Sequence, residues 1–243
     1  MKLYMVSLGC AKNQVDSEMI LGVCKTQMEL VASPEEADIL MVNTCAFIEP
    51  ARKEAIDVIL SLADYKSGGK KLIVCGCLPQ RYKKEIEDLL PEVDRFIRID
   101  EYGDIGRIID SVVSSDYHLT EECSYLNRVY STPSYMRYVK ISEGCMNHCA
   151  FCAIPLIRGR LKSRRIEDIV EEVKMHVREG AYEINLISQD TTKYGYDLYH
   201  RLTLVDLLKE LVVIEGDFKI RLLYLYPDLS LIHISEPTRP LYI

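Results

Sequence analysis

Residues 144–152 read GCMNHCAFC. In this stretch Cys145, Cys149 and Cys152 are separated by three and then by two residues, so their thiols can converge on one side of a tight loop. Cysteine thiolates are the usual ligands of iron–sulfur clusters, and three of them can hold three corners of a cubic cluster. No fourth cysteine follows, which would leave one iron open to a ligand that is not protein. A structural zinc ion usually takes four ligands in two pairs, so zinc or three free thiols are the weaker interpretations.

Length and composition indicate a globular protein. The chain has 243 residues, of which 48% are hydrophobic and 28% charged, enough for one large domain or two ordinary ones. No apolar run approaches the roughly 20 residues that a membrane span needs, and the apolar start MKLYMVSLGC is too short for a signal peptide. Without an export signal, nine cysteines are better explained as metal ligands or core residues than as disulfides. We therefore expect a cytoplasmic protein that does not associate with membranes.

The charge balance argues against a nucleic-acid-binding protein. Residues 1–115 carry 14 Lys and Arg against 19 Asp and Glu, and residues 137–228 carry 14 of each. Neither part has the basic excess that gripping a phosphate backbone requires. One local basic run exists, and a solvated loop is the simpler interpretation of it: Arg158, Arg160, Lys162, Arg164 and Arg165.

The first part of the chain alternates short apolar runs with segments of helical apolar spacing. The predicted strands are partly β-branched and cover Leu3–Val6, Ile39–Val42, Leu72–Val74 and Phe96–Ile99. Strands that alternate with helices predict a parallel sheet with helices on its faces. We assign this α/β domain to residues 1–115, and a polar linker to residues 116–135.

A second α/β series follows over residues 136–228. It consists of predicted strands at Met136–Ile141, Glu183–Ile187 and Lys219–Leu225 and predicted helices at Ile166–Arg178 and Leu204–Val213. Such units build (β/α) barrels, whose chemistry lies on loops at the carboxyl ends of the strands. The cysteine loop follows the first of these strands, and the segment Ser188–Thr191 follows the second.

Three more cysteines each follow a predicted strand of the first domain: Cys10, Cys45 and Cys77. Because the carboxyl ends of parallel strands share one edge of the sheet, these thiols could converge on a second metal site. Cysteine is also a common buried hydrophobe, so the spacing alone leaves both interpretations open. Cys24 and Cys75 lack this placement and are predicted core residues, and Cys123 has no assigned role.

The chain resembles the radical S-adenosylmethionine (SAM) methylthiotransferase family. The matching strings follow the family's order from residue 1 to about residue 228: SLGCAKNQVDSE (7–18), VNTCAF (42–47), GCLPQRY (76–82), ISEGCMNHCAFCAIP (141–155) and RGRLKSR (158–164). The resemblance implies an N-terminal methylthiotransferase domain followed by a radical-SAM barrel.

The resemblance also implies the cofactors. It implies two [4Fe–4S] clusters, one on Cys10, Cys45 and Cys77 and one on Cys145, Cys149 and Cys152, and SAM bound at the open iron of the second. Phe151, before the last cysteine, fits that pattern. Ser188 and Gln189 are candidate SAM contacts, with a polar strand end as the alternative. Arg158 and Arg160 could balance anionic clusters through charge-assisted hydrogen bonds.

The segment LISQDTTKYGYD (186–197) resembles the branch of the family that modifies a ribosomal protein. That branch implies addition of a methylthio group to the β-carbon of an aspartate in the small-subunit protein uS12. It also implies an electron donor such as flavodoxin or ferredoxin, and we expect a monomer. The alternative within the family is methylthiolation of isopentenyl-adenosine in tRNA.

The resemblance ends at Asp228. The last segment, LSLIHISEPTRPLYI (229–243), has no sustained strand or helix period and matches nothing in the family. We therefore expect a truncated, partial barrel with an aberrant tail. An inactive iron–sulfur fragment, or a cluster protein that only transfers electrons, is the alternative to an enzyme.

Overall fold

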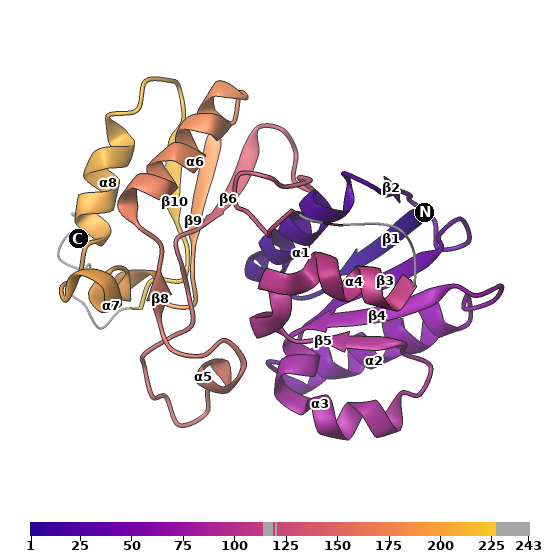
Figure 1. The fold of residues 1–243 in the computed structure, drawn as a ribbon. Helices are drawn as coiled ribbons and strands as arrows, with labels where there is room; N and C mark the ends of the chain where they lie inside the picture. The colour runs from indigo at the N-terminus through magenta and orange to yellow at the C-terminus, as the bar shows by residue number, and fades with distance from the viewer. Residues whose placement is uncertain (114–118, 120, 227–243) are drawn as a thin grey trace, which may run out of the picture. The chain divides into compact units, whose positions relative to one another are not determined.

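A computed structural model describes residues 1–113, 119 and 121–226 (Figure 1). The chain forms two compact units, one of Met1–Pro133 with Cys149–Arg158 and one of Ser134–His148 with Gly159 onward. The tail predicted over residues 229–243 lies outside the described residues. No helix formed by the described residues is both long and apolar enough to cross a membrane.

The first unit is built on a parallel sheet of five strands in the order β2-β1-β3-β4-β5. The strands are β1 (Lys2–Ser7), β2 (Glu29–Leu30), β3 (Ile39–Thr44), β4 (Lys71–Gly76) and β5 (Arg95–Ile97). The predicted α/β class with a parallel sheet is therefore confirmed. The two-residue strand β2 was not predicted, because so short a segment shows no periodicity.

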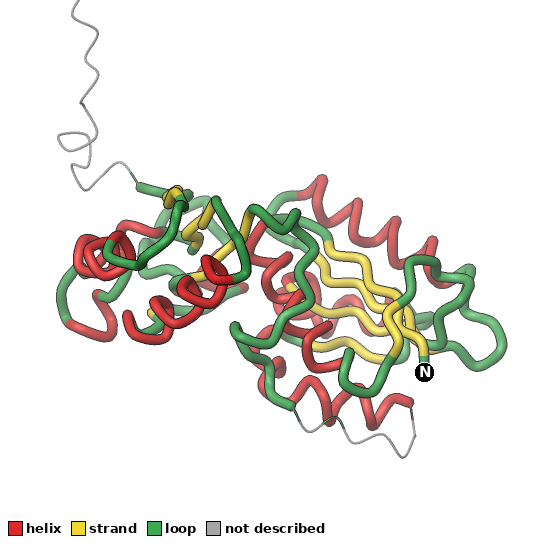
Figure 2. The backbone as a smooth tube through the Cα atoms, turned by 90° about the horizontal axis from the view of Figure 1, so that it is seen from above, coloured by secondary structure: helices red, strands yellow, loops and turns green. Residues whose placement is uncertain are grey.

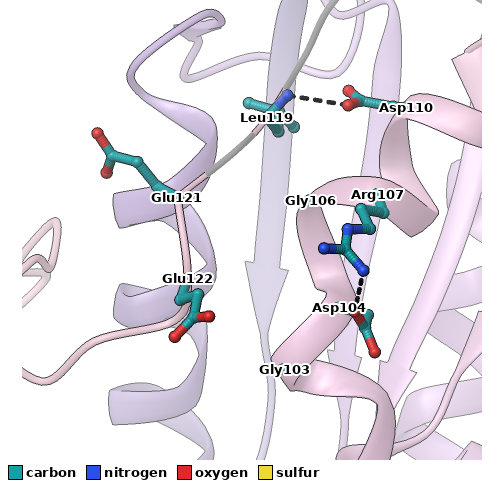
Figure 3. Close-up of a pocket in the computed structure, with 8 residues that line it drawn as sticks. All are labelled: Gly103, Asp104, Gly106, Arg107, Asp110, Leu119, Glu121 and Glu122. Carbon is teal, nitrogen blue, oxygen red and sulfur yellow. Dashed lines mark hydrogen bonds and ion pairs between the residues drawn. The ribbon is translucent and has the colours of Figure 1, made fainter.

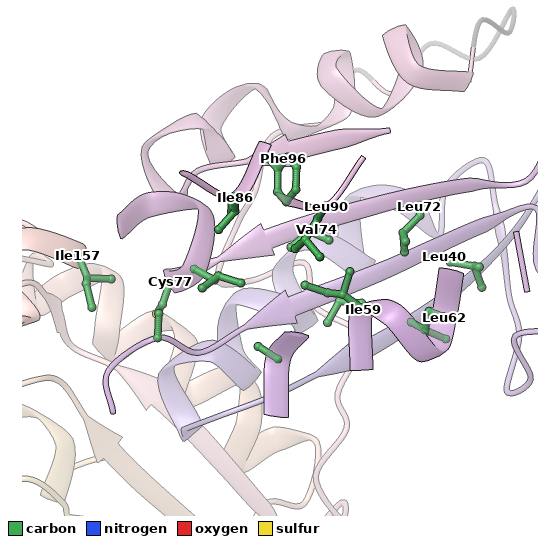
Figure 4. Packing of buried hydrophobic residues seen from close by; sticks show 14 of the residues in the cluster. Leu40, Ile59, Leu62, Leu72, Val74, Cys77, Ile86, Leu90, Phe96 and Ile157 are labelled. Carbon is green, nitrogen blue, oxygen red and sulfur yellow. The ribbon is translucent and has the colours of Figure 1, made fainter. Parts of the chain in front are cut away.

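Helices cover both faces of this sheet (Figure 2). They are α1 (Ala11–Cys24), α2 (Glu49–Ala63), α3 (Cys77–Leu89) and α4 (Ile105–Val113), with a 3-10 turn at Ile99–Asp104. Alternate strand residues point to opposite faces. Leu40 and Val74 therefore join Ile59 of α2 and Ile86 of α3 in one buried cluster (Figure 4). The neighbouring residues Met41 and Ile73 pack instead with Ile20 of α1 and Ile109 of α4.

The register aligns the carboxyl ends of the three central strands. Ser7 pairs with Asn43 between β1 and β3, and Thr44 pairs with Gly76 between β3 and β4. The strand order also reverses between β1 and β3, the point at which open α/β sheets bind ligands. Cys10 and Cys45 follow the two strands that flank this reversal, and Cys77 follows the next strand.

The described part of the predicted linker packs against α1. The backbone N–H of Val129 donates to the Glu18 carbonyl across 3.0 Å, and the Ser131 hydroxyl donates to Glu18 Oε1 across 2.7 Å. Arg128 is buried and forms an ion pair with the same Glu18 carboxylate at 3.8 Å. Residues 121–133 thus belong to the first compact unit, while the proposed domain boundaries themselves stay a prediction.

The second unit contains a parallel sheet of three strands in the order β10-β9-β6. Its elements are β6 (Met136–Lys140), β7 (Ser142–Glu143), β8 (Lys162–Ser163), α6 (Ile166–Arg178), β9 (Glu183–Ile187), a 3-10 turn at Thr191–Lys193, α7 (Tyr196–Tyr199), α8 (Leu204–Val212) and β10 (Lys219–Leu222). The short helix α5 (Ile154–Ile157) lies within the segment assigned to the first unit. The bounds predicted for α6 and β9 are confirmed.

Candidate metal centres

The cysteines of the first unit lie where strands end and helices begin. Cys10 caps the N-terminus of α1, Cys77 is the first residue of α3, and Cys45 directly follows β3. The N-terminal end of a helix carries a partial positive charge and stabilises thiolates and other anions. Two of the three thiols therefore stand in positions that favour an anionic ligand set.

Several contacts bring these cysteine segments together. A Cβ atom at Gly9 would lie 3.2 Å from Cys45 Sγ, so the Gly9–Cys10 turn lies directly against Cys45. Burial raises the pKa of Cys77, the adjacent Arg158 guanidinium acts in the opposite direction, and the charge of Cys45 raises the pKa further. Cys45 and Cys77 are thus close enough to influence each other electrostatically.

Asn13, on the first turn of α1, connects all three segments. Its side-chain amide donates to the Leu8 carbonyl across 3.0 Å and to the Thr44 carbonyl across 2.9 Å. Its Oδ1 atom accepts from the Cys77 thiol across 3.5 Å. Leu8 and Thr44 lie just before Cys10 and Cys45, so this one fully buried side chain fixes the loops that carry the three thiols.

The three thiols of the first site are donors of the type that an iron–sulfur cluster uses. Among residues 1–113, 119 and 121–226, no three His, Cys, Asp or Glu side chains are close enough to hold one metal ion. A cubic cluster has four irons, and each thiolate binds a different one, so its ligands stand further apart than those of one ion. Three thiols around one sheet edge, with Arg158 beside Cys77, provide ligands of that kind and a positive charge for an anionic group.

We predict that Asn13→Ala destabilises the apoprotein strongly. The change leaves the part-buried Leu8 carbonyl and the buried Thr44 carbonyl without the Asn13 donor, and a loss of this kind costs about 1–3 kcal/mol. A urea unfolding curve should show a loss of about 3 kcal/mol. Gln14→Ala is the matched control, since Gln14 is the next residue of α1 and its hydrogen bond to Ser131 is exposed. Equal effects of the two changes would contradict the role assigned to Asn13.

The second set of cysteines lies on the loop between β7 and α5. Cys145 belongs to the second unit, where its N–H donates to the Gly159 carbonyl across 3.2 Å and its sulfur accepts from the Asn147 N–H across 3.4 Å. Cys149 and Cys152 belong to the first unit and form a turn, with the Cys152 N–H donating to the Cys149 carbonyl across 3.0 Å. All three are partly exposed.

Polar side chains tie the start of this loop to the carboxyl end of β9. Glu143 accepts from Lys140 Nζ across 2.7 Å, and its other oxygen accepts from the side-chain amide of Gln189. Asn147 donates to Asp190 across 2.6 Å. The sequence did not point to Glu143, Asn147 or Asp190, because their pairing depends on the neighbouring positions of β6 and β9 in the sheet.

The three residues predicted to contact SAM, Ser188, Gln189 and Phe151, differ in burial and in hydrogen bonding. Ser188 is fully buried and its hydroxyl lies 3.2 Å from that of Thr191. Gln189 is engaged with Glu143 through its amide nitrogen, and its Oε1 atom is buried with no hydrogen-bond partner among the described residues. Phe151 is 89% exposed. Contact of these residues with SAM stays a prediction.

The basic run does not form one solvated loop. Arg160, Lys162 and Arg165 are exposed, but Arg158 is buried and Arg164 reaches the buried Glu172, with 2.5 Å between Nη1 and Oε2. The solvated-loop interpretation is therefore wrong for Arg158. It failed because the pattern of charges in a sequence does not reveal a buried carboxylate supplied by a distant segment.

Cys24 and Cys75, which the sequence predicted as core residues, lie in the core. Cys24 and Cys75 are fully buried against α4 and its neighbours, and burial raises the pKa of each thiol to about 12. Such thiols stay protonated at neutral pH and make poor metal ligands. Cys123 packs partly buried against the same cluster.

A cavity of about 320 Å³ in the first unit contains none of the cysteines (Figure 3). Its lining includes Asp104, which pairs with Arg107 at 3.2 Å, and Asp110, which accepts from the Leu119 N–H across 2.9 Å. Glu121 and Glu122 also line it. Four carboxylates against one guanidinium disfavour an anionic ligand, so this cavity is not the candidate site.

Two known families match separate parts of the chain. Residues 2–98 match the Uncharacterized protein family UPF0004, and residues 139–231 match the Radical SAM superfamily. The first match contains Cys10, Cys45 and Cys77, and the second contains Cys145, Cys149 and Cys152. The expected order of an N-terminal α/β domain and a radical-SAM domain is thereby confirmed.

Curated relatives carry a more specific name. The chain is 45% identical to a protein of Dictyoglomus thermophilum named ribosomal protein uS12 methylthiotransferase RimO, over 99% of the chain and 58% of that protein. It is 49% identical to the RimO of Aquifex aeolicus, over 93% of the chain and 50% of that protein. The chain thus spans about half the length of the curated relatives it matches.

Solved structures share the fold at low sequence identity. The methyltransferase TsrM from Kitasatospora setae, solved with cobalamin and a [4Fe–4S] cluster, has a TM-score of 0.57 at 11% identity, over 87% of this chain and 50% of TsrM. The cobalamin-dependent enzyme OxsB has a TM-score of 0.56 at 14% identity, over 90% of this chain and 38% of OxsB. Both are radical SAM enzymes.

These findings define a radical-SAM protein with an N-terminal UPF0004 domain, a class that implies SAM and a [4Fe–4S] cluster as cofactors. More particularly, the chain belongs to the radical-SAM methylthiotransferase family, as the sequence indicated.

Proposed function

We propose that this chain carries the catalytic centre of a methylthiotransferase that modifies the β-carbon of an aspartate in ribosomal protein uS12. The observation that supports the proposal is that Cys10, Cys45 and Cys77 follow strands that end at one edge of the first sheet, in a chain whose second domain is of the radical-SAM type. A radical-SAM enzyme that only cleaves SAM needs one cluster, whereas sulfur insertion also needs a sulfur source. The name of the RimO relatives supplies the substrate.

Two cysteine sets would hold two [4Fe–4S] clusters in this proposal. Cys145, Cys149 and Cys152 would hold the cluster whose open iron binds SAM, and Cys10, Cys45 and Cys77 would hold the other. When bound, these groups supply the reductive cleavage of SAM, the sulfur and the methyl group. An electron donor such as flavodoxin or ferredoxin and a monomeric state are part of the proposal, and a ribosomal substrate implies a cytoplasmic enzyme.

The chain's own residues position these groups. Asn13 holds the three segments of the first set through its bonds to Leu8, Thr44 and Cys77. Glu143 and Asn147 hold the start of the second loop against Gln189 and Asp190. Residues locked by such bonds keep ligands in a fixed geometry, and outer-shell partners of this kind typically change metal affinity or activity 10- to 100-fold when mutated.

Charge is consistent with a protein substrate. Residues 137–228 carry equal numbers of acidic and basic residues, 14 of each, so this part lacks the excess of positive charge that tRNA binding usually requires. The choice between the two branches rests on this balance, on the segment 186–197 and on the names of the relatives.

The proposal predicts the products of a direct assay. The reconstituted protein, incubated anaerobically with SAM and a strong reductant, should produce deoxyadenosine and place a methylthio group on one aspartate of uS12, detectable by mass spectrometry of the peptide. An isopentenyl-adenosine tRNA should remain unmodified in parallel. Methylthiolated tRNA would assign the chain to the other branch, and a protein that binds iron but yields no deoxyadenosine would be an electron-transfer or scaffold protein.

A further inference from the structure

Residues 149–158 contribute to the core of the first unit. Ala153 and Ile157 are 8% and 2% exposed and belong to the same buried cluster as Cys77 and Leu78 (Figure 4). Arg158 ends this segment with a side chain that is only 2% exposed. A guanidinium so deeply buried must have its charge and its donors satisfied by partners, because an unpaired buried charge is strongly unfavourable.

Three partners of Arg158 lie at the Cys10/Cys45/Cys77 site. Nη1 donates to Asp16 Oδ2 across 2.6 Å, and the Asp16 side chain is 3% exposed. Nη2 donates to Asn13 Oδ1, the atom that also accepts from the Cys77 thiol. Nη2 also lies 3.4 Å from Cys77 Sγ, within hydrogen-bonding distance of sulfur. One planar fork thus contacts a carboxylate, an amide and a predicted cluster ligand.

We infer that Arg158 is a positioning residue of the Cys10/Cys45/Cys77 cluster, although in sequence it follows the other cysteine loop, and that its N–H···S hydrogen bond to Cys77 raises the reduction potential of that cluster. The inference rests on the proposed function for the presence of a cluster at this site. It distinguishes Arg158 from Arg160, which is two residues away and exposed.

The physical basis is the charge that accumulates on the sulfur ligands when a cluster is reduced. Hydrogen bonds to the sulfurs stabilise the more negative, reduced form and so raise the potential. Arg158 is suited to this because its rigid fork holds one N–H towards Cys77 while another is fixed by Asp16. Asp16 offsets the formal charge of Arg158. The N–H···S hydrogen bond therefore affects the reduction potential more than the net charge of the pair does. A lysine, with a single flexible ammonium, cannot make the same three contacts.

The test uses the Cys149→Ala protein, which should hold only the cluster in question. Arg158→Met alone would leave Asp16 buried without its cation and could prevent folding. The informative comparison is therefore the double change Arg158→Met with Asp16→Asn against the parent Cys149→Ala protein, because replacing both members of the ion pair leaves the net charge unchanged. The measurements are iron per chain, the melting temperature of the apoprotein, and the midpoint potential from a redox titration monitored by electron paramagnetic resonance.

Loss of the donor should lower the midpoint potential. We expect a shift on the order of tenfold in the equilibrium between reduced and oxidised cluster, about 59 mV for one electron, with iron still bound. Arg158→Lys should restore the potential only in part, and Arg160→Gln should leave it unchanged. Asp16→Asn alone should shift it in the opposite direction, because the guanidinium then lacks its counter-charge.

Two outcomes would overturn the inference in distinguishable ways. If the cluster loads normally and its potential is the same with and without Arg158, the residue only stabilises the fold, and the proposed function stands. If the Cys149→Ala protein binds no cluster at all, the Cys10/Cys45/Cys77 site itself is refuted, and the proposed function fails with it.

Discussion

Replacing Cys45 with alanine should abolish methylthiolation of uS12 while leaving SAM cleavage measurable, whereas Cys149→Ala should abolish both. The difference follows from the separate tasks proposed for the two cysteine sets. Cys149 lies in the GCMNHCAFC loop, whose predicted cluster binds and cleaves SAM. Cys45 follows β3 and lies beside Gly9 at the other predicted site, whose proposed cluster would supply sulfur. Deoxyadenosine and methylthiolated peptide are measured in the same reaction.

Cys75→Ala is the matched control for this experiment. Cys75 is only two residues from Cys77, but it is fully buried with Ile73 and Ile97 on the opposite face of the sheet. Its replacement should preserve both activities. If Cys45→Ala and Cys149→Ala removed deoxyadenosine and methylthiolated peptide to the same extent, the two sets would form one site and the division of tasks would be wrong.

Gly76→Ala should cause a large loss of stability. Gly76 has φ 98° and ψ −149°, a conformation that essentially only glycine adopts. A Cβ atom there would lie 2.6 Å from the Thr44 carbonyl oxygen and 2.8 Å from the Thr44 nitrogen, and it would also clash with Asn43 Oδ1. Since these atoms belong to the neighbouring strand, relief requires moving β3 or the Cys77 turn. We expect a loss of about 3 kcal/mol or more in the free energy of unfolding.

Gly69→Ala separates the clash from the backbone strain. Gly69 also has a positive φ, 87°, but a Cβ atom there would meet nothing within 4 Å. Its replacement should cost about 1 kcal/mol, the usual penalty of a left-handed conformation. Urea unfolding of the two apoproteins measures the difference. A Gly76→Ala protein as stable as the Gly69→Ala protein would show that β3 and β4 are not packed as described.

Much of the fold could be predicted because local periodicity and tertiary packing agree. The helix Ile166–Arg178 and the strand Glu183–Ile187 have the predicted bounds, since each buries a regular apolar face. The strand pattern also placed Cys10, Cys45 and Cys77 at one sheet edge, because parallel strands end together. The topology of a parallel sheet was therefore enough to predict that these three cysteines lie at the same edge.

The polar interior of α1 could not be predicted in the same way. Lys12, Asn13, Asp16, Ser17 and Glu18 are all buried, although side chains of these types are mostly exposed in proteins. Their partners come from distant segments, such as Arg158 for Asp16 and residues 129–131 for Glu18. The pairing of β7 with β8 was missed because each strand has only two residues. Hydrogen bonds between distant segments leave no periodic signal in a sequence.

The most direct test of the central claim is the number of irons bound by four anaerobically reconstituted proteins. The unmodified protein should bind about eight irons, two cubic clusters of four. Cys149→Ala and Cys45→Ala should each bind about four, and the protein with both changes should bind almost none. About four irons in the unmodified protein, with none left after either single change, would contradict the existence of two independent sites.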